Sequence, residues 1–259
     1  MAATEKALEI DHNMADAWAS LAYLKRGRSD WAGAKVAIDK AIKLEPNNFL
    51  VVGTAATLAG TFGQLDKSIE LFELNVRQDP LGLGSLRALA IRYICAGRFD
   101  EALEALNRVL VIHPGFPAVH INLAGTYLLK GDAETALIEI NKDPSFFWQA
   151  FMKVRILSTL GREAEAQVMI KQLLEGPADQ APLAMAATYA WRGENDLVFE
   201  WFEKARLQGT VSFAIFLIDP WFRNLVNDPR YALFVEEIGL LEYWKAMPPE
   251  YGGPAKATN

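Results

Sequence analysis

The sequence has few of the residues that support catalysis or metal binding. Its 259 residues include one cysteine, Cys95, so an intramolecular disulfide is excluded, and the apolar residues around it indicate a small buried side chain. The three histidines have no second His, Cys or acidic residue at metal-ligand spacing, so we expect no metal site. A glycine-rich phosphate loop and a serine nucleophile motif are also missing. The sequence therefore predicts no catalytic residues, no cofactor and no enzyme.

Long apolar segments and an excess of positive charge are missing as well. No run of about 18 apolar residues occurs, which argues against a membrane span. No charged-then-apolar leader opens the sequence, so we expect no secretory signal. The formal net charge of −6 disfavours unspecific binding to nucleic acid or anionic lipid. Together with the single cysteine, these features predict a reducing, cytoplasmic location.

The sequence is rich, by contrast, in internal periodicity. Two residue types recur at intervals of 34 residues, the glycines Gly63, Gly97 and Gly131 and the prolines Pro46, Pro80 and Pro114. The glycines mark predicted turns between two helices, where a positive φ carries no penalty only for glycine. The prolines end the second helix of each pair. Coincidence of period and residue type indicates a repeat protein.

Residues 15–48 show how one such helix pair would pack. One face of the first helix and one face of the second carry large and small apolar residues in turn: Trp18, Leu21 and Ala22, then Ala34, Ile38 and Ala41. Asp30 stands where an N-cap would begin the second helix. This spacing is similar to the tetratricopeptide repeat (TPR) pattern W-x2-L-G-x2-Y…A-x3-F…P. The resemblance implies an all-α fold, an α-solenoid of antiparallel helix pairs (a TPR superhelix) that binds protein segments without catalysis of its own.

The resemblance divides the chain into about six repeat units with a C-terminal helical cap. The predicted units are 15–48, 49–82, 83–116, 117–146, 147–178 and 179–212, followed by capping helices at 213–246 and a flexible tail at 247–259. Residues 1–14 are either a capping helix or the remnant of a preceding unit, and we favour a remnant. The second helix of the fourth unit is predicted to be short, with Asp143 as the N-cap and Pro144 as the first residue of the next helix.

Residues from about 180 to 240 resemble the closing segment of a group of bacterial TPR proteins. The resemblance rests on the segments 188–194 and 199–205 and on the pairs Asp219-Pro220 and Asp228-Pro229. In that group such a tail often follows a winged-helix DNA-binding domain, a nucleotide cyclase or a protein kinase. This sequence contains no such effector, so none of those activities carries over. Two functions stay open, a protein-binding scaffold or a regulatory or oligomerisation segment of a larger bacterial signalling enzyme or transcription regulator.

The TPR resemblance also implies where a partner would bind. The first helix of each unit lines the concave face, so its non-core positions are the candidates for contact with a protein or peptide segment: Asp16, Tyr23, Arg26, Thr54, Thr57, Arg87, Ile91, Asn122, Phe151 and Arg155. Aromatic, amide and guanidinium groups suit an extended peptide. The Lys and Asn set with which some TPR proteins hold chaperone tails is replaced by Ala19, Tyr23 and Thr54, so we do not predict that partner. Self-association through the unpaired N-terminal helix is a further expected use.

Overall fold

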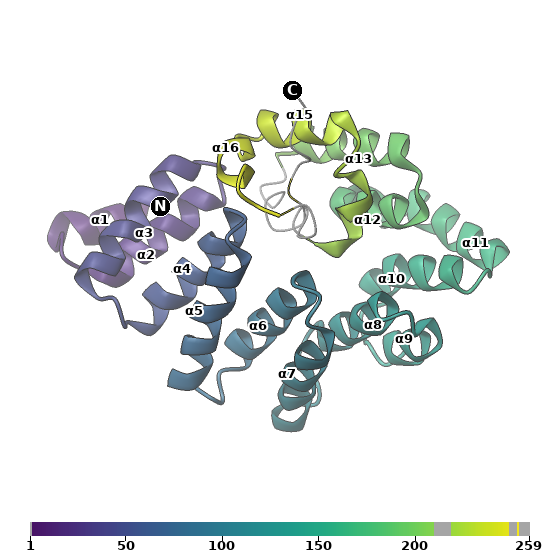
Figure 1. The fold of residues 1–259 in the computed structure, drawn as a ribbon, viewed down its shortest axis with the longest axis horizontal. Helices are drawn as coiled ribbons and strands as arrows, with labels where there is room; N and C mark the ends of the chain where they lie inside the picture. The colour runs from purple at the N-terminus through teal and green to yellow at the C-terminus, as the bar shows by residue number, and fades with distance from the viewer. Residues whose placement is uncertain (1, 210–218, 249–252, 254–259) are drawn as a thin grey trace.

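The computed structural model describes residues 2–209, 219–248 and 253, and these residues form helices and turns with no strand (Figure 1). The helices of the repeat array are α1 (Ala2–Ile10), α2 (Ala15–Arg26), α3 (Trp31–Leu44), α4 (Phe49–Thr61), α5 (Leu65–Gln78), α6 (Leu83–Cys95), α7 (Phe99–Ile112), α8 (Val119–Leu129), α9 (Ala133–Ile140), α10 (Phe146–Thr159), α11 (Glu163–Leu174), the short 3₁₀ helix η1 (Pro177–Gln180), α12 (Pro182–Arg192) and α13 (Asn195–Leu207). Three further helices follow, η2 (Pro220–Leu225, 3₁₀), α15 (Pro229–Glu237) and α16 (Leu241–Trp244).

Consecutive helices pack as pairs, α2 with α3 and so on to α12 with α13. The turns inside these pairs carry the predicted glycines, and both Gly63 and Gly97 have a φ of +73°. Asp30 caps α3, because its Oδ1 accepts a hydrogen bond from the Gly33 amide at 2.9 Å. Each pair then stacks on the next along an arc (Figure 1). The predicted all-α solenoid is confirmed.

Alanines make the closest contacts between paired helices. Ala22, Ala34 and Ala41 are each 0% exposed, so the backbones of α2 and α3 approach one another without a large side chain between them. We expected Trp18 to fill the space around them, but Trp18 is only half-buried, and its Nε1 donates to the carbonyl of His12 at 2.8 Å. Trp31, at the start of α3, is the buried tryptophan of this unit.

The regular packing changes after α8. The helix α9 has only 8 residues, as the sequence predicted for this position. The next helix begins later than expected, because Ser145 rather than Asp143 caps α10. The Asp143 carboxylate instead accepts from the Ser145 amide at 2.8 Å, so it stabilises the turn before the cap. Buried residues of α8, α9 and α10 form an apolar cluster of their own, separate from the main core.

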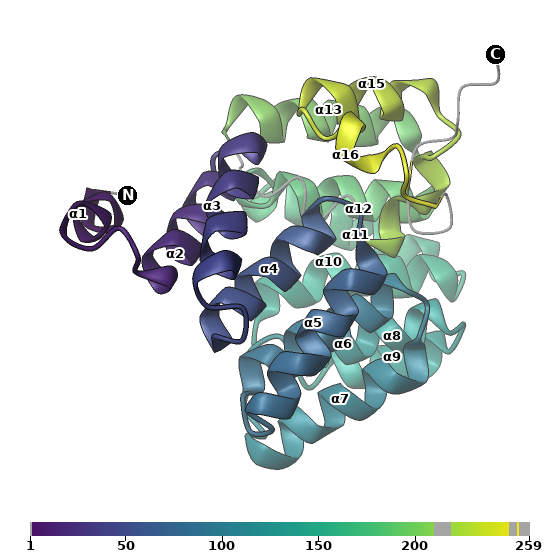
Figure 2. The same ribbon diagram turned by 60° about the vertical axis from the view of Figure 1, so that its left-hand side comes forward.

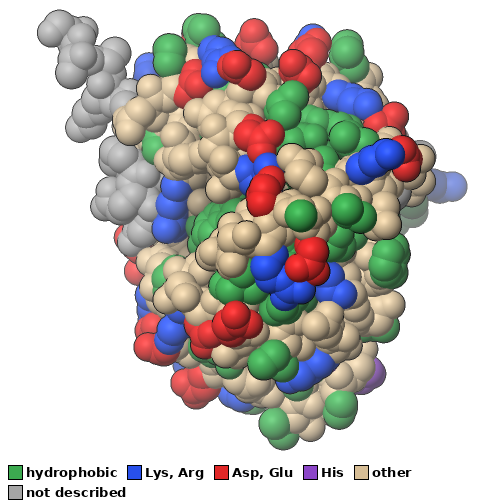
Figure 3. Space-filling model, turned by 90° about the vertical axis from the view of Figure 1, so that its right-hand side faces the viewer, with side chains coloured by type: hydrophobic (Ala, Val, Ile, Leu, Met, Phe, Trp, Pro, Cys, Tyr) green, Lys and Arg blue, Asp and Glu red, His purple; other side chains and the backbone are tan. Residues whose placement is uncertain are grey.

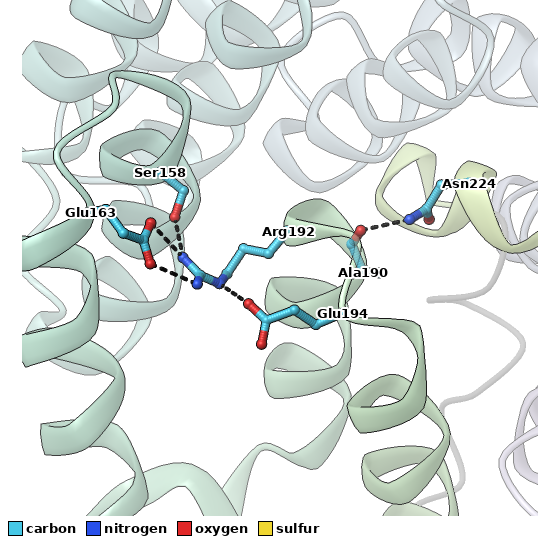
Figure 4. Close-up of polar contacts among 6 residues, drawn as sticks. All are labelled: Ser158, Glu163, Ala190, Arg192, Glu194 and Asn224. Carbon is cyan, nitrogen blue, oxygen red and sulfur yellow. Dashed lines mark hydrogen bonds and ion pairs between the residues drawn. The ribbon is translucent and has the colours of Figure 1, made fainter.

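A polar network holds the shortened units together (Figure 4). The guanidinium of Arg192, at the end of α12, donates to Ser158 Oγ of α10 at 2.6 Å and to both carboxylate oxygens of Glu163 at 2.8 and 3.0 Å. It also pairs with Glu194 in the following turn. Arg192 therefore connects α10, α11 and α12 through one side chain. Its side chain is 10% exposed, but that of Glu163 is 52% exposed, so solvent still screens part of this ion pair.

The C-terminal helices pack on the last helices of the array. Phe234 of α15 stacks on Phe202 of α13 with ring centroids 4.6 Å apart, and Phe222 of η2 lies 5.3 Å from the same ring. Asn224 donates to the carbonyl of Ala190 in α12 at 2.7 Å (Figure 4). The Asp228 side chain caps α15 by accepting from the Arg230 amide. Asp219 makes no such cap at η2.

These helices also reach back to the first two units, which the sequence did not predict. Trp31 Nε1 donates to the carbonyl of Ile238 at 2.6 Å, and Trp244 Nε1 donates to the carbonyl of Thr61 at 2.8 Å. The rings of Phe62 and Tyr243 stack at 4.4 Å. We call these contacts the closure contact. In Figures 1 and 2, α16 accordingly lies beside α3 and α4, and the arc of helices becomes a ring.

The two ends of the chain differ from expectation in detail. Met247, which we placed in a flexible tail, is 5% exposed and lies against Gly63. Residues 249–252 and 254–259 of that tail, and residues 210–218 at the junction of the sixth unit and the cap, lie outside the described residues. At the other end, α1 contacts α2 at the edge of the array (Figure 2), and its Leu8 is buried while its Ile10 is 80% exposed.

Candidate functional site

Eight of the ten predicted concave-face residues line two hollows. The first, which we call the N-terminal groove, has a volume of about 530 Å³ and lies on α2, α4 and α6. Tyr23, Thr54 and Thr57 of the predicted set line it. The second, which we call the central cavity, has a volume of about 260 Å³. Five predicted residues line the cavity, namely Arg87, Ile91, Asn122, Phe151 and Arg155.

The N-terminal groove combines exposed apolar side chains with one buried polar group. Tyr23, Phe49 and Leu50 are 53%, 44% and 43% exposed, high values for residues of this size. Asn75 of α5 lies in the wall and is 2% exposed, yet its Oδ1 has no hydrogen-bond partner among the described residues. A buried acceptor without a donor costs about 1–3 kcal/mol. The groove therefore offers both apolar area and an acceptor that a bound group could satisfy.

The central cavity is lined by two arginines and by apolar side chains. Arg87 Nε donates to Asn122 Oδ1 at 3.1 Å, which joins α6 to α8. Arg155 is 5% exposed, and its guanidinium lies 4.7 Å from the ring centroid of Trp221. One Arg155 nitrogen donates to the carbonyl of Ala184 at 3.3 Å. Trp221 thus completes the cavity from the C-terminal segment.

Burial shifts the titration of the groups around this cavity. Loss of solvent lowers the pKa of Arg155 to about 10, so it stays charged at neutral pH. Loss of solvent also raises the pKa of Asp219 to about 6, although Arg92 and Arg155 oppose that shift. Burial raises the pKa of the Cys95 thiol to about 12, and its Sγ lies 3.7 Å from Asp219 Oδ1. The thiol is therefore an unreactive core group, as the sequence indicated.

Two predicted residues line neither hollow. The carboxylate of Asp16 accepts from the Asn48 side chain at 2.9 Å, which braces the start of α4. Arg26 is buried and lies over the ring of Tyr23 at 4.8 Å. The expectation that all ten residues occupy non-core positions is wrong for Arg26, Thr54, Phe151 and Arg155, which are all buried. The close stacking of neighbouring first helices covers these positions.

Several residues of both hollows were missed from the sequence. Phe49 and Leu50 begin α4 and were read only as the start of a unit. Two adjacent large apolar residues directly after an N-cap, where solvent usually reaches, could have indicated them. Asp219 and Trp221 were assigned to a cap, and only the return of the C-terminal segment into the ring places them at the central cavity. No local signal identifies that.

Other kinds of site receive no support from the residues that the structure describes. Among them, no group of three His, Cys, Asp or Glu side chains is arranged to hold a metal ion. In the same residues, every helix is too short or too polar to cross a bilayer. His120 lies half-buried with Nδ1 2.6 Å from Glu139 Oε1, so it is a packed side chain. On the face shown in Figure 3, Lys and Arg side chains alternate with Asp and Glu.

Comparisons with known proteins identify the repeat. The family model described as tetratricopeptide repeat matches residues 94–146. A tetratricopeptide repeat and J domain-containing co-chaperone of Fusarium oxysporum f. sp. lycopersici is 31% identical over 74 residues, which cover 29% of this chain. The match spans 14% of that relative's length, so its whole-protein activity does not transfer. The resemblance of the C-terminal part to tails of bacterial regulators stays a prediction.

Solved structures agree in fold. The type IV pilus biogenesis factor PilW superposes with a TM-score of 0.61 at 22% identity, covering 68% of this chain and 83% of PilW. A tetratricopeptide repeat protein from Parabacteroides merdae gives a TM-score of 0.65 at 13% identity, covering 86% and 90% of the two chains. At these identities the likeness concerns the fold alone. Residues 94–146 thus match the tetratricopeptide repeat model, and the helix pairs on either side of this segment have the fold of tetratricopeptide repeat structures.

Proposed function

We propose that this chain is a non-enzymatic TPR scaffold that binds an extended segment of a partner protein in its N-terminal groove. A protein-interaction role is what the TPR fold implies. The single observation that supports this groove is its exposed apolar lining, with Tyr23, Phe49 and Leu50 each more than 40% exposed on the concave side. Such side chains would be covered if a partner lay across them.

The geometry of the groove favours an extended peptide over a globular surface. Its lining comes mainly from α2, α4 and α6, the first helices of three successive units, with Phe72 and Asn75 of α5 in the wall, so a ligand would have to cross three units. The lining is mostly apolar, so apolar side chains of the ligand would supply most of the affinity. The Asn75 Oδ1 is buried in the wall, so it would accept an N–H of the ligand only after the Asn75 side chain turns toward the groove.

Selection from a random peptide display library tests this proposal. We expect recovered peptides to lose at least about tenfold in affinity, or 1.4 kcal/mol, when the groove is changed by Tyr23→Ser, Phe49→Ser and Leu50→Ser together. A control variant removes three similarly exposed apolar side chains elsewhere, Val36→Ser, Ile42→Ser and Leu207→Ser. Equal binding to the parent and the groove variant would contradict the groove assignment.

The alternative role is that of a regulatory or oligomerisation segment in a larger bacterial protein. An oligomerisation role can be measured directly as self-association through α1. Support for it is limited to one exposed large apolar residue, Ile10 at 80%, since Leu8 packs inward. Light scattering over a range of concentrations, with Ile10→Ser as the variant, would show a concentration-dependent mass only in the parent. A cytoplasmic location is proposed on the single, buried thiol alone.

A further inference from the structure

The central cavity has the features of a small-molecule site. It is bounded by α6, α8, α10 and α12 on one side and by Asp219 and Trp221 of the C-terminal segment on the other. We propose that it binds a small carboxylic acid with an aromatic or branched apolar body. This site is separate from the N-terminal groove, and the inference does not depend on the proposed function.

The size of the cavity sets the size of the ligand. An apolar cavity of about 150 Å³ is known to hold benzene. The central cavity has a volume of about 260 Å³, which is room for a phenyl ring with a short acidic side chain. A peptide in extended conformation would need a continuous channel, and the ring of helices closes this space on the side of Trp221.

The cavity lining carries two arginines, Arg87 and Arg155, and one acidic residue, Asp219. Within the described residues, Arg155 makes a single hydrogen bond, to a backbone carbonyl, and its buried Nε has no partner. Arg87 Nε binds a neutral amide, Asn122, rather than a carboxylate. Behind the wall, Arg92 is also buried, and its Nε and Nη1 have no partner in the same part of the chain. Buried guanidinium groups without an anion cost several kcal/mol, so an anion that enters here is stabilised.

Asp219 does not neutralise this charge fully. Among the described residues, its carboxylate makes one side-chain hydrogen bond, with Cys95 Sγ at 3.7 Å. Burial raises the pKa of Asp219 to about 6, so the nearby arginines do not offset its loss of solvent. In the lining, Arg87 and Arg155 therefore share one carboxylate, and that carboxylate also lies near Arg92 and Arg223. A ligand carboxylate would supply the second negative charge and accept hydrogen bonds from Arg155 and Arg87.

The rest of the lining is apolar and fits an aromatic body. Phe151, Met152 and Ile91 form the wall on α10 and α6, and Trp221 faces them. Because Gly125 of α8 has no side chain, Trp221 and Met152 can pack closely against this helix. A Cβ at Gly125 would lie 3.2 Å from the indole and 3.3 Å from the Met152 methyl. The lining thus places flat apolar surfaces beside the arginine donors.

Titration calorimetry with 3-phenylpropionate and its neutral isostere 3-phenylpropanamide tests the inference. We expect the acid to bind and the amide to bind at least about tenfold more weakly, a difference of 1.4 kcal/mol. Arg155→Gln should lower the affinity for 3-phenylpropionate by at least the same factor. Since Arg155 is buried and this variant could unfold, Arg87→Gln, at a half-buried position, serves as the second variant. Arg108→Gln, on the exposed side of α7, is the matched control and should leave binding unchanged.

The outcomes separate this site from the peptide groove. The groove variant with three serines should bind 3-phenylpropionate as the parent does, so failure of either proposal leaves the other intact. Equal affinity for acid and amide would contradict the role of the arginines. No heat with acid at about 10 mM, or unchanged binding in both arginine variants, would overturn the site.

Discussion

Gly63→Ala, compared with Gly97→Ala as a matched control, isolates the contribution of the contact between the C-terminal segment and the first units to stability. Both glycines occupy the same repeat position and both have a φ of +73°, so a Cβ strains both backbones alike. That strain costs roughly 1–2 kcal/mol. The surroundings differ, because a Cβ at Gly97 has no neighbour within 4 Å, whereas a Cβ at Gly63 would lie 3.0 Å from Met247 Sδ and 3.3 Å from Trp244 Cδ1.

The difference between the two variants therefore measures the closure contact. Overpacking of this kind costs typically about 1–3 kcal/mol beyond the backbone strain. We expect Gly63→Ala to lower the free energy of unfolding by that additional amount relative to Gly97→Ala. Urea unfolding followed by circular dichroism at 222 nm provides both values. If the two variants lose the same free energy of unfolding within about 0.5 kcal/mol, Met247 and Trp244 do not pack on the first units in solution.

Three further predictions test other parts of the structure. The raised pKa of Asp219 means that its protonated carboxyl favours the fold at pH values below 3.8, the usual pKa of an aspartic acid, and this stabilisation is lost as pH rises through about 6. Asp219→Asn should therefore gain stability relative to the parent between pH 4 and 7, and a constant difference would contradict its burial. Cys95, with its pKa raised to about 12, should react with a thiol reagent at pH 8 only as fast as the C-terminal segment opens, so labelling at the rate of a free thiol would refute its burial. Arg192→Lys should cost about 1–3 kcal/mol in urea unfolding because lysine cannot reproduce the fork to Glu163, while the exposed Arg162→Lys should cost less than about 1 kcal/mol.

The regular part of the fold could be predicted because it is specified locally. The glycine turns and the Asp30 cap depend on residues within one helix pair, and the spacing of 34 residues repeats them. The start of α10 could not be read in the same way. Asp143-Pro144 is a plausible helix start, yet Ser145 provides the cap two residues later, because the register has already slipped after α9. Both Asp143 and Ser145 satisfy the sequence rule for an N-cap, so only the packing of the helices decides which of them begins α10.

The closure contact and the central cavity lay beyond sequence reasoning for a different reason. Trp31 and Ile238 are separated by 207 residues, and their hydrogen bond exists only because the superhelix brings its two ends together. The curvature of the whole array decides this, and it accumulates from small rotations between units. The same return of the chain places Trp221 over Arg155. The pattern of first helices supplied eight of the lining residues, whereas the division of these residues between two hollows required the structure.

The most direct test of the central claim, peptide binding in the N-terminal groove, is to map a selected peptide onto the protein by amide chemical-shift changes. The account predicts that the largest changes fall on α2, α4 and α6 around Tyr23, Leu50 and Thr57. The amides of α3 and α7, on the outer side of the array, should move little. Changes concentrated on those outer helices, with the groove amides unmoved, would contradict it.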